Sequence, residues 1–193
     1  MDREGLAWEE VETKHILQNE WIDFRESSFR FPDGSVYGPF YSYSRRNYVV
    51  IVASDIEGKY ICVRQFRQGI KQVTTEFPAG GIERADGREY GDQNEAAEEA
   101  LAAAKRELLE ETGYESKEWR HLITLPSNAT IADNYAFIYE AKNCRKVSGQ
   151  ELDETEFLNV ELIAKEKLEG MVHRGEFQQS VHVMAWLLSV KTA

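Results

Sequence analysis

The sequence predicts an α/β sandwich, and three observations favour this fold class. Strand-like and helix-like runs alternate along the 193 residues, with hairpins between strands and few helices. Hydrophobic residues make up 42% of the chain, including nine Phe, nine Tyr and four Trp, which is enough for a packed core. The length fits one domain, or one domain with an extension.

The charge balance argues against some classes of partner. Asp and Glu number 34 against 23 Lys and Arg, so the formal net charge is −11. We expect no binding to nucleic acid or to an anionic membrane, because both are polyanions. Cys62 and Cys144 do not form a metal-binding motif, and no signal peptide or membrane span is recognisable. We therefore expect a soluble, cytoplasmic protein.

The N-terminal residues predict a β-strand extension at 1–44, followed by the main domain at 45–193. Apolar and polar side chains alternate through residues 8–31, and the turn signal PDGS follows at 32–35. This pattern is typical of two or three strands.

The next segments predict a hairpin and a long helix. YVVIVAS (48–54) and YICVRQF (60–66) are β-rich runs joined by turn residues. TTEFPAGGIE (74–83) is a short extended piece that ends in a Pro/Gly loop. Helix-forming residues dominate from about 94 to Thr112, and Gly113 supplies a helix stop.

The C-terminal part predicts three strands and two helices. The strands are expected at 118–125, 134–141 and 157–163, with an acidic loop at 148–156. Helices are expected at 164–175 and 177–190. The second carries Val181, Met184, Ala185 and Leu188 at helical spacing, which predicts a stripe that faces the core.

The end of the long helix, RELLEETGY (106–114), crowds acidic residues. Glu107, Glu110 and Glu111 fall within an arc of about 100° on an ideal helix. Like charges at this spacing repel by about 0.2–0.5 kcal/mol per pair, and by more where water is excluded. One interpretation is a solvated acidic face. The other is a site for Mg²⁺ or Mn²⁺, which prefers carboxylate oxygen.

The same segment resembles the Nudix hydrolase box, with Glu98 at the place of the acid that precedes the box arginine. YICVRQFRQ and TTEFPAGGIE are similar to the ADP-sugar branch of that family, which includes ADP-ribose pyrophosphatases. The resemblance covers about residues 40–190. It implies a Nudix α/β/α sandwich with a mixed sheet, preceded by an antiparallel β extension. One departure is an insertion of twelve residues at 84–95.

The resemblance implies an enzyme in which water attacks phosphorus in a nucleoside diphosphate linked to another group. ADP-ribose or another ADP-sugar ranks first as the small-molecule substrate, giving AMP and a sugar phosphate. GDP-mannose or another nucleotide sugar ranks second. A Nudix module that binds a nucleotide without hydrolysing it is the rival from a different class. Relatives in this branch are typically homodimers through the N-terminal sheet, so we expect a homodimer.

The resemblance also implies the metal ligands. Glu107 and Glu111 are the expected ligands of Mg²⁺ or Mn²⁺, and Glu110 joins them directly or through water. The backbone carbonyl of Ala79 matches the remaining protein ligand of the family.

Two further catalytic roles follow from the same resemblance. Arg106 is expected to hold the glutamates by ion pairing, most favourably with Glu98. The general base is expected in the acidic loop, where the candidates are Glu151, Asp153, Glu154 and Glu156. Of these, Glu154 is our choice.

Substrate-binding residues are expected on the strands. Arg67 and either Arg45 or Arg46 match arginines that grip the diphosphate or the terminal sugar, and solvated edge-strand arginines are the alternative. Glu76 is expected to accept from a ribose hydroxyl or an adenine amine, unless it is a surface charge. Trp21 is a candidate for stacking on the base, with a core or dimer-interface role as the alternative.

Overall fold

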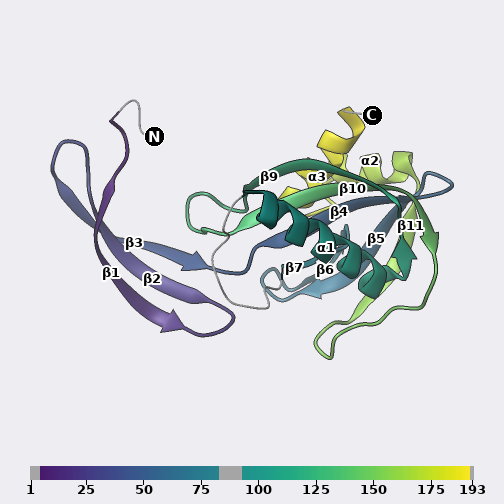
Figure 1. Cartoon of the computed structure of the whole chain (residues 1–193), viewed down its shortest axis with the longest axis horizontal. Coiled ribbons are helices and arrows are strands. Elements are labelled where there is room, and N and C mark those ends of the chain that lie inside the picture. The colour runs from purple at the N-terminus through teal and green to yellow at the C-terminus, as the bar shows by residue number, and fades with distance from the viewer. Residues whose placement is uncertain (1–4, 83–92, 192–193) are drawn as a thin grey trace. The chain divides into compact units, whose positions relative to one another are not determined.

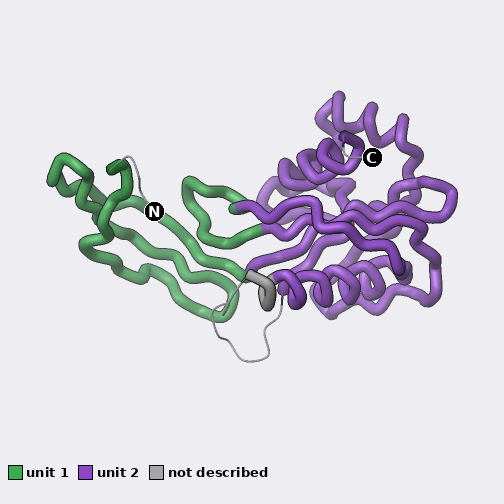
Figure 2. The backbone as a smooth tube through the Cα atoms, turned by 45° about the horizontal axis from the view of Figure 1, so that its top comes forward, with its two compact units in different colours: residues 1–46, 126–135 green, residues 47–125, 136–193 purple. Residues whose placement is uncertain are grey.

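The computed structural model describes residues 5–82 and 93–191. The chain divides into two compact units (Figure 2). Unit 1 combines Met1–Arg46 with Pro126–Tyr135, and unit 2 combines Asn47–Leu125 with Ala136–Ala193. A segment from the middle of the sequence thus belongs to the N-terminal unit. The domain boundary expected at residues 44 and 45 stays a prediction.

Unit 1 is built on a three-stranded antiparallel sheet in the order β1-β2-β3. Its strands are β1 (Glu9–Gln18), β2 (Asp23–Arg30) and β3 (Val36–Ser44). The segment 126–135 joins this sheet through β3, because the Tyr43 amide donates to the Ile131 carbonyl at 2.9 Å. Asp133 also accepts hydrogen bonds from Arg25 and Ser44.

Unit 2 contains an eight-stranded sheet that opens in the middle. The predicted hairpin is formed by β4 (Tyr48–Asp55) and β5 (Tyr60–Arg67), which pair only at Ala53 with Ile61 and at Ser54 with Tyr60. Beyond these pairs, β6 (Gln72–Glu76) pairs with β5 and β7 (Ala79–Gly81) pairs with β4. β4 and β5 therefore diverge, and the extended TTEFPAGG segment lies between them and pairs with both.

The remaining strands make the sheet mixed. They are β8 (Tyr114–Glu115), β9 (Glu118–Pro126), β10 (Tyr135–Lys146) and β11 (Leu158–Ile163). β10 runs parallel to β4, whereas β11 runs antiparallel to β5. The expected mixed sheet is thus confirmed.

Helices cover both faces of this sheet (Figure 1). They are α1 (Gln93–Thr112), α2 (Lys165–His173) and α3 (Ser180–Lys191). Alternate residues of β4 point to opposite faces, so Ile51 packs in the cluster that contains Leu108 of α1, and Val52 in the cluster that contains Trp186 of α3. This arrangement is the α/β/α sandwich expected from the sequence.

The stripe of α3 that was predicted to face the core is confirmed in part. Ala185 is buried, and Val181 and Met184 are partly buried and pack against the same core cluster. The fully buried companions of Ala185 are His182, Trp186 and Ser189, which the pattern did not single out. The helix presents Trp186 to the core, since this large ring removes more apolar area from water than the side chains predicted to be buried. Within the described residues, no helix is long and apolar enough to cross a membrane.

Candidate active site

Gly113 ends α1 and brings a loop against its last turn. The residue has φ +73°, and a Cβ there would lie 2.3 Å from the Ser148 carbonyl oxygen. Any other residue would be strained and would clash with this backbone. Gly113 also accepts a hydrogen bond from the Val147 amide at 2.9 Å. The glycine predicted to end the helix therefore leaves room for the backbone at Ser148, which leads into the acidic loop.

The acidic loop is fixed to the C-terminal end of α1. The Glu151 amide donates to the Glu110 carbonyl at 2.9 Å, and the Gln150 side-chain amide donates to the Glu111 carbonyl at 2.8 Å. These contacts satisfy carbonyls that the end of a helix leaves without an intrahelical partner. They hold the loop next to the predicted metal-binding glutamates.

The Pro/Gly loop approaches α1 from the sheet. A Cβ at Gly80 would lie 2.0 Å from the carboxyl carbon of Glu107, so any other residue would force this carboxylate to move. The Ala79 amide donates to Glu111 at 3.1 Å. The backbone of β7 thus lies directly against two glutamates of α1.

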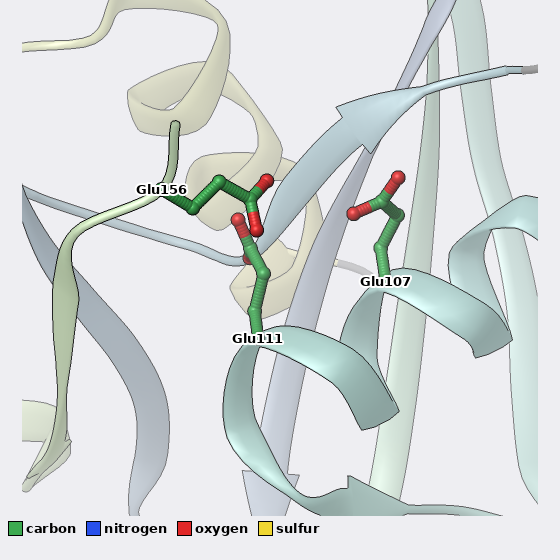
Figure 3. A group of neighbouring side chains, drawn as sticks. All are labelled: Glu107, Glu111 and Glu156. Carbon is green, nitrogen blue, oxygen red and sulfur yellow. The ribbon is translucent and has the colours of Figure 1, made fainter. Parts of the chain in front are cut away.

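Three carboxylates meet in this place. Glu107 and Glu111 of α1 and Glu156 of the acidic loop each offer one oxygen, and these oxygens lie within 4.8 Å of one another. Figure 3 shows Glu107 and Glu111 on successive turns of α1, with Glu156 reaching towards Glu111 from the loop before β11. We call Glu107, Glu111 and Glu156 the carboxylate group.

Burial makes this group costly in its ionised form. Glu107 and Glu111 are 6% and 2% exposed. Burial raises the pKa of Glu107 to about 7, although Arg106 acts in the opposite direction. Burial also raises the pKa of Glu111 well above its usual range, and the charge of Glu107 adds to this effect.

The carboxylate group fits a hard divalent cation. All three donors are carboxylate oxygens close to one another, and the Ala79 backbone lies beside them. Such an oxygen set suits Mg²⁺ or Mn²⁺ far better than a soft metal. A bound cation would also offset the repulsion between the buried charges.

Arg106 binds the acidic residues next to it. Its guanidinium donates to Glu107 at 2.6 Å, to Glu110 at 2.7 Å and to the Gly81 carbonyl at 3.1 Å. The expected pairing with Glu98 is wrong, because eight residues of helix separate the two by about 12 Å along the axis. Glu98 is exposed on α1. Its contribution to catalysis stays a prediction, as does metal binding by Glu110, which is paired with Arg106.

The structure distinguishes the four acidic candidates of the loop. Glu156 is half-buried and belongs to the carboxylate group. Glu154, our choice from the sequence, is exposed, as are Glu151 and Asp153. Sequence spacing gave no means of separating them, because all four lie in one loop without periodic structure. Which of them acts as the base stays a prediction.

Two of the expected substrate residues bind each other. Arg67 donates to Glu76 through Nε at 2.9 Å and through Nη2 at 2.6 Å. Glu76 is wholly buried, whereas the Arg67 side chain is 34% exposed. Sequence reasoning missed the neighbours of this pair, Thr74 and Gln179, because uncharged polar residues carry no distinctive signal.

The other expected substrate residues lie in unit 1. Arg45 and Arg46 are exposed where unit 1 ends, and Trp21 is 68% exposed between β1 and β2. Their roles in binding a substrate stay predictions. Of the predicted insertion at 84–95, residues 84–92 lie outside the described part of the chain.

A family model and a relative in sequence identify the family. The NUDIX domain model matches residues 44–187. An ADP-ribose pyrophosphatase of Bacillus subtilis (strain 168) is 31% identical over 81% of this chain and 78% of that protein. A methanol dehydrogenase activator of Bacillus methanolicus is 26% identical over 98% of this chain and 97% of that protein. The crystal structure of an ADP compounds hydrolase has the same fold, with a TM-score of 0.75, 18% identity, and coverage of 95% and 92% of the two chains.

Proposed function

The chain belongs to the Nudix family of hydrolases, and from this premise we propose that it hydrolyses the pyrophosphate bond of a nucleoside diphosphate sugar with the help of Mg²⁺ or Mn²⁺. ADP-ribose or another ADP-sugar is the substrate that we rank first, and AMP and a sugar phosphate are the products. GDP-mannose or another nucleotide sugar ranks second. The name of the B. subtilis relative supports this order.

The observation that carries the proposal is the carboxylate group at the end of α1. Two of its members are almost wholly buried, and their oxygens lie close to that of Glu156. A protein without a use for a cation would gain stability by replacing buried acids with neutral residues. Hydrolysis of a pyrophosphate gives the acids a use, since negative charge increases at the leaving group during the reaction.

The residues around the group have distinct tasks in this proposal. Glu107, Glu111 and the Ala79 carbonyl would hold the metal, which when bound would neutralise charge on the diphosphate. Arg106 keeps Glu107 in place through its short ion pair. Arg67 meets the diphosphate with the part of its guanidinium that Glu76 does not occupy. Glu156 or Glu154 takes the proton from the attacking water.

A substrate panel tests the proposal. The purified protein is incubated with ADP-ribose, other ADP-sugars and GDP-mannose at a fixed Mg²⁺ concentration, and nucleoside monophosphate is quantified by chromatography. We expect AMP from ADP-ribose, at a rate that EDTA abolishes and excess Mg²⁺ restores. Turnover that continues in EDTA would contradict the role of the metal. GMP released faster than AMP would favour the second-ranked substrates.

A second candidate is regulation without hydrolysis. The match to the methanol dehydrogenase activator favours it, because this similarity extends over almost the whole of both chains, including unit 1. In that case the protein binds a nucleotide and acts on a dehydrogenase. Absence of turnover on the complete panel, together with a faster dehydrogenase reaction when the protein is added, would support this candidate over the first.

We further propose that the protein is a cytoplasmic homodimer. The described cysteines, Cys62 and Cys144, are buried free thiols, as is usual in a reducing compartment. Unit 1 exposes aromatic side chains, among them Trp8 at 48% and Phe40 at 39%. A second copy of the chain would remove this apolar surface from water.

A further inference from the structure

Glu76 is a buried carboxylate that lies outside the carboxylate group. Its side chain is 0% exposed. Besides the Arg67 bonds described above, it accepts hydrogen bonds from the Thr74 hydroxyl and from the Gln179 side-chain amide, the latter at 3.3 Å. Protein donors on three segments therefore surround this side chain, which is buried away from any ligand in solution.

The environment keeps Glu76 ionised. Burial raises the pKa of Glu76, but the hydrogen bonds from Arg67 and Thr74 outweigh this effect and bring it below the usual value. The residue is thus an anion at neutral pH, and its charge-assisted hydrogen bonds to Arg67 are of the strong, directional kind. Two donors of the guanidinium on one carboxylate also fix the plane of the group.

Arg67 extends from this buried anchor to the site. One edge of its guanidinium, with Nε and Nη2, faces Glu76. The third nitrogen, Nη1, has no hydrogen-bond partner among the described residues. Arg67 also lies close enough to Glu111 for the two charges to interact. Among the described residues, the donors on Nη1 are thus left available to an anion.

The start of α3 contacts the end of β6. Gln179 comes directly before α3 and holds Glu76, the last residue of β6. His182, in the first turn of α3, accepts a hydrogen bond from the Phe77 amide at 3.1 Å through Nδ1. Its ring also stacks on the Phe77 ring with an interplanar angle of 6°. The last residue of β6 and the residue that follows it are thus both held by the start of α3.

We infer that Glu76 is a positioning residue, which orients the Arg67 guanidinium towards the substrate diphosphate and is itself held by Thr74 and by Gln179 of the α3 segment. The inference rests on the proposed hydrolysis. It replaces the expectation that Glu76 contacts a ribose or an adenine. Orientation matters because a correctly placed donor contributes to the rate, whereas a mobile one must first be ordered.

A double-mutant cycle tests this inference. Its variants are Glu76→Gln, Arg67→Ala and the double variant, and kcat and KM are measured with the best substrate of the panel. We expect Glu76→Gln to lower kcat/KM by about tenfold in the wild type and by less than about twofold in the Arg67→Ala background, because a residue that acts through Arg67 is not additive with it. Equal losses in both backgrounds would overturn the inference.

A matched control separates this effect from the general loss of an ion pair. Arg64 and Glu161 form a more exposed pair between the neighbouring strands β5 and β11, at 3.5 Å. Glu161→Gln should change kcat/KM by less than about twofold, as expected for an exposed pair. A tenfold loss in this control would overturn the specific role of Glu76. If Glu76→Gln does not fold, Thr74→Val takes its place in the cycle, since it removes one of the hydrogen bonds to Glu76 and retains a similar side-chain shape.

A spectroscopic measurement observes the orientation directly. The Arg67 Nε–H group, identified by its absence in Arg67→Ala, should give a sharp, slowly exchanging NMR signal in the wild type and exchange rapidly in Glu76→Gln. An Arg67 signal that is unchanged in this variant would overturn the inference, whatever the kinetics. Absence of wild-type turnover on the panel would instead reject the proposed function. Turnover with an additive cycle would reject the positioning role alone.

Discussion

The two units of the protein depart from the ordinary rules of burial in opposite directions. Unit 2 has a conventional apolar core, yet it buries two glutamates of α1 close to a third carboxylate. Unit 1 buries very little, and leaves large apolar side chains in water. Each departure is unfavourable by itself, so each supports one of the proposed binding partners, a cation for unit 2 and a second copy of the chain for unit 1.

The aromatic side chains of unit 1 make this comparison concrete. Trp8 stacks on Phe31 with ring centroids 4.1 Å apart, and Phe40 lies 5.4 Å from Trp8. Tyr37, which is 57% exposed, extends the cluster through Phe31. A hydrophobic cluster that is ordered but still half-exposed is typical of an interface and not of a complete core.

The largest expected effect concerns the buried charges of unit 2. Glu111→Gln should lower kcat by at least about a thousandfold, because a proposed metal ligand is lost. The thermal midpoint measured without metal should not fall, since the substitution also removes the buried charge of Glu111. Turnover and differential scanning fluorimetry measure the two quantities. More than about a tenth of the wild-type activity in this variant would contradict the ligand role. Glu115→Gln, just past the helix, is the control and should retain its activity.

The next prediction compares the same change, isoleucine to alanine, at a buried position of unit 2 and at an exposed position of unit 1. Ile51→Ala, in the core of unit 2, should lower the free energy of unfolding by about 3 kcal/mol. Ile16→Ala, at a position that is 47% exposed in unit 1, should cost less than about 0.5 kcal/mol. Denaturant titration measures both. An equal loss for Ile16→Ala would show that this side chain is covered in solution.

Two variants of the acidic loop test whether Glu156 or Glu154 takes part in the reaction. Glu156→Gln should lower kcat by about a hundredfold, the usual range for loss of a general base or a ligand. Glu154→Gln should change kcat by less than about threefold, since an exposed charge is largely screened by water. Steady-state kinetics at saturating metal provides the comparison. The reverse order would restore Glu154 as the base.

Removal of the exposed aromatic side chains of unit 1 should weaken the proposed homodimer. Trp8→Ser combined with Phe40→Ser should raise the dissociation constant of the homodimer by at least about tenfold, as expected for aromatic anchors of an interface. Analytical ultracentrifugation over a concentration series measures this change. Ile56→Ser, at a position that is 60% exposed in unit 2, is the control and should not alter it. A wild-type protein that is monomeric at all concentrations would refute the proposal.

The smallest expected effect is on the pH dependence of stability. The pKa of Glu107 is raised to about 7, so its neutral form favours the folded state below the unfolded pKa, and this advantage is lost as pH rises towards 7. Without metal, Glu107→Gln should therefore stabilise the protein relative to wild type more at pH 8 than at pH 4.5. Thermal midpoints in EDTA measure the difference. A difference that does not depend on pH would contradict the raised pKa.

Sequence patterns predicted those parts of the molecule that follow from local chemistry. The β4–β5 hairpin and α1 follow from β-rich runs with a turn and from a run of helix formers that Gly113 ends. The approach of Glu107 and Glu111 followed from helical geometry alone. Glu156 could not be singled out, because only the docking of its loop on α1 separates it from the other loop acids. The position of Glu76 depends on Arg67, Thr74 and Gln179, which are brought together by pairing of strands and packing of α3 rather than by spacing.

The closeness of Gly80 to Glu107 links two places that lie far apart in the sequence. A single methyl group at position 80 would occupy the space of the Glu107 carboxyl group. Gly80→Ala should therefore displace the Glu107 carboxylate and lower turnover, even though every charged residue is still present. A homologue without this glycine would have to place that carboxylate elsewhere, even when its acidic helix is intact.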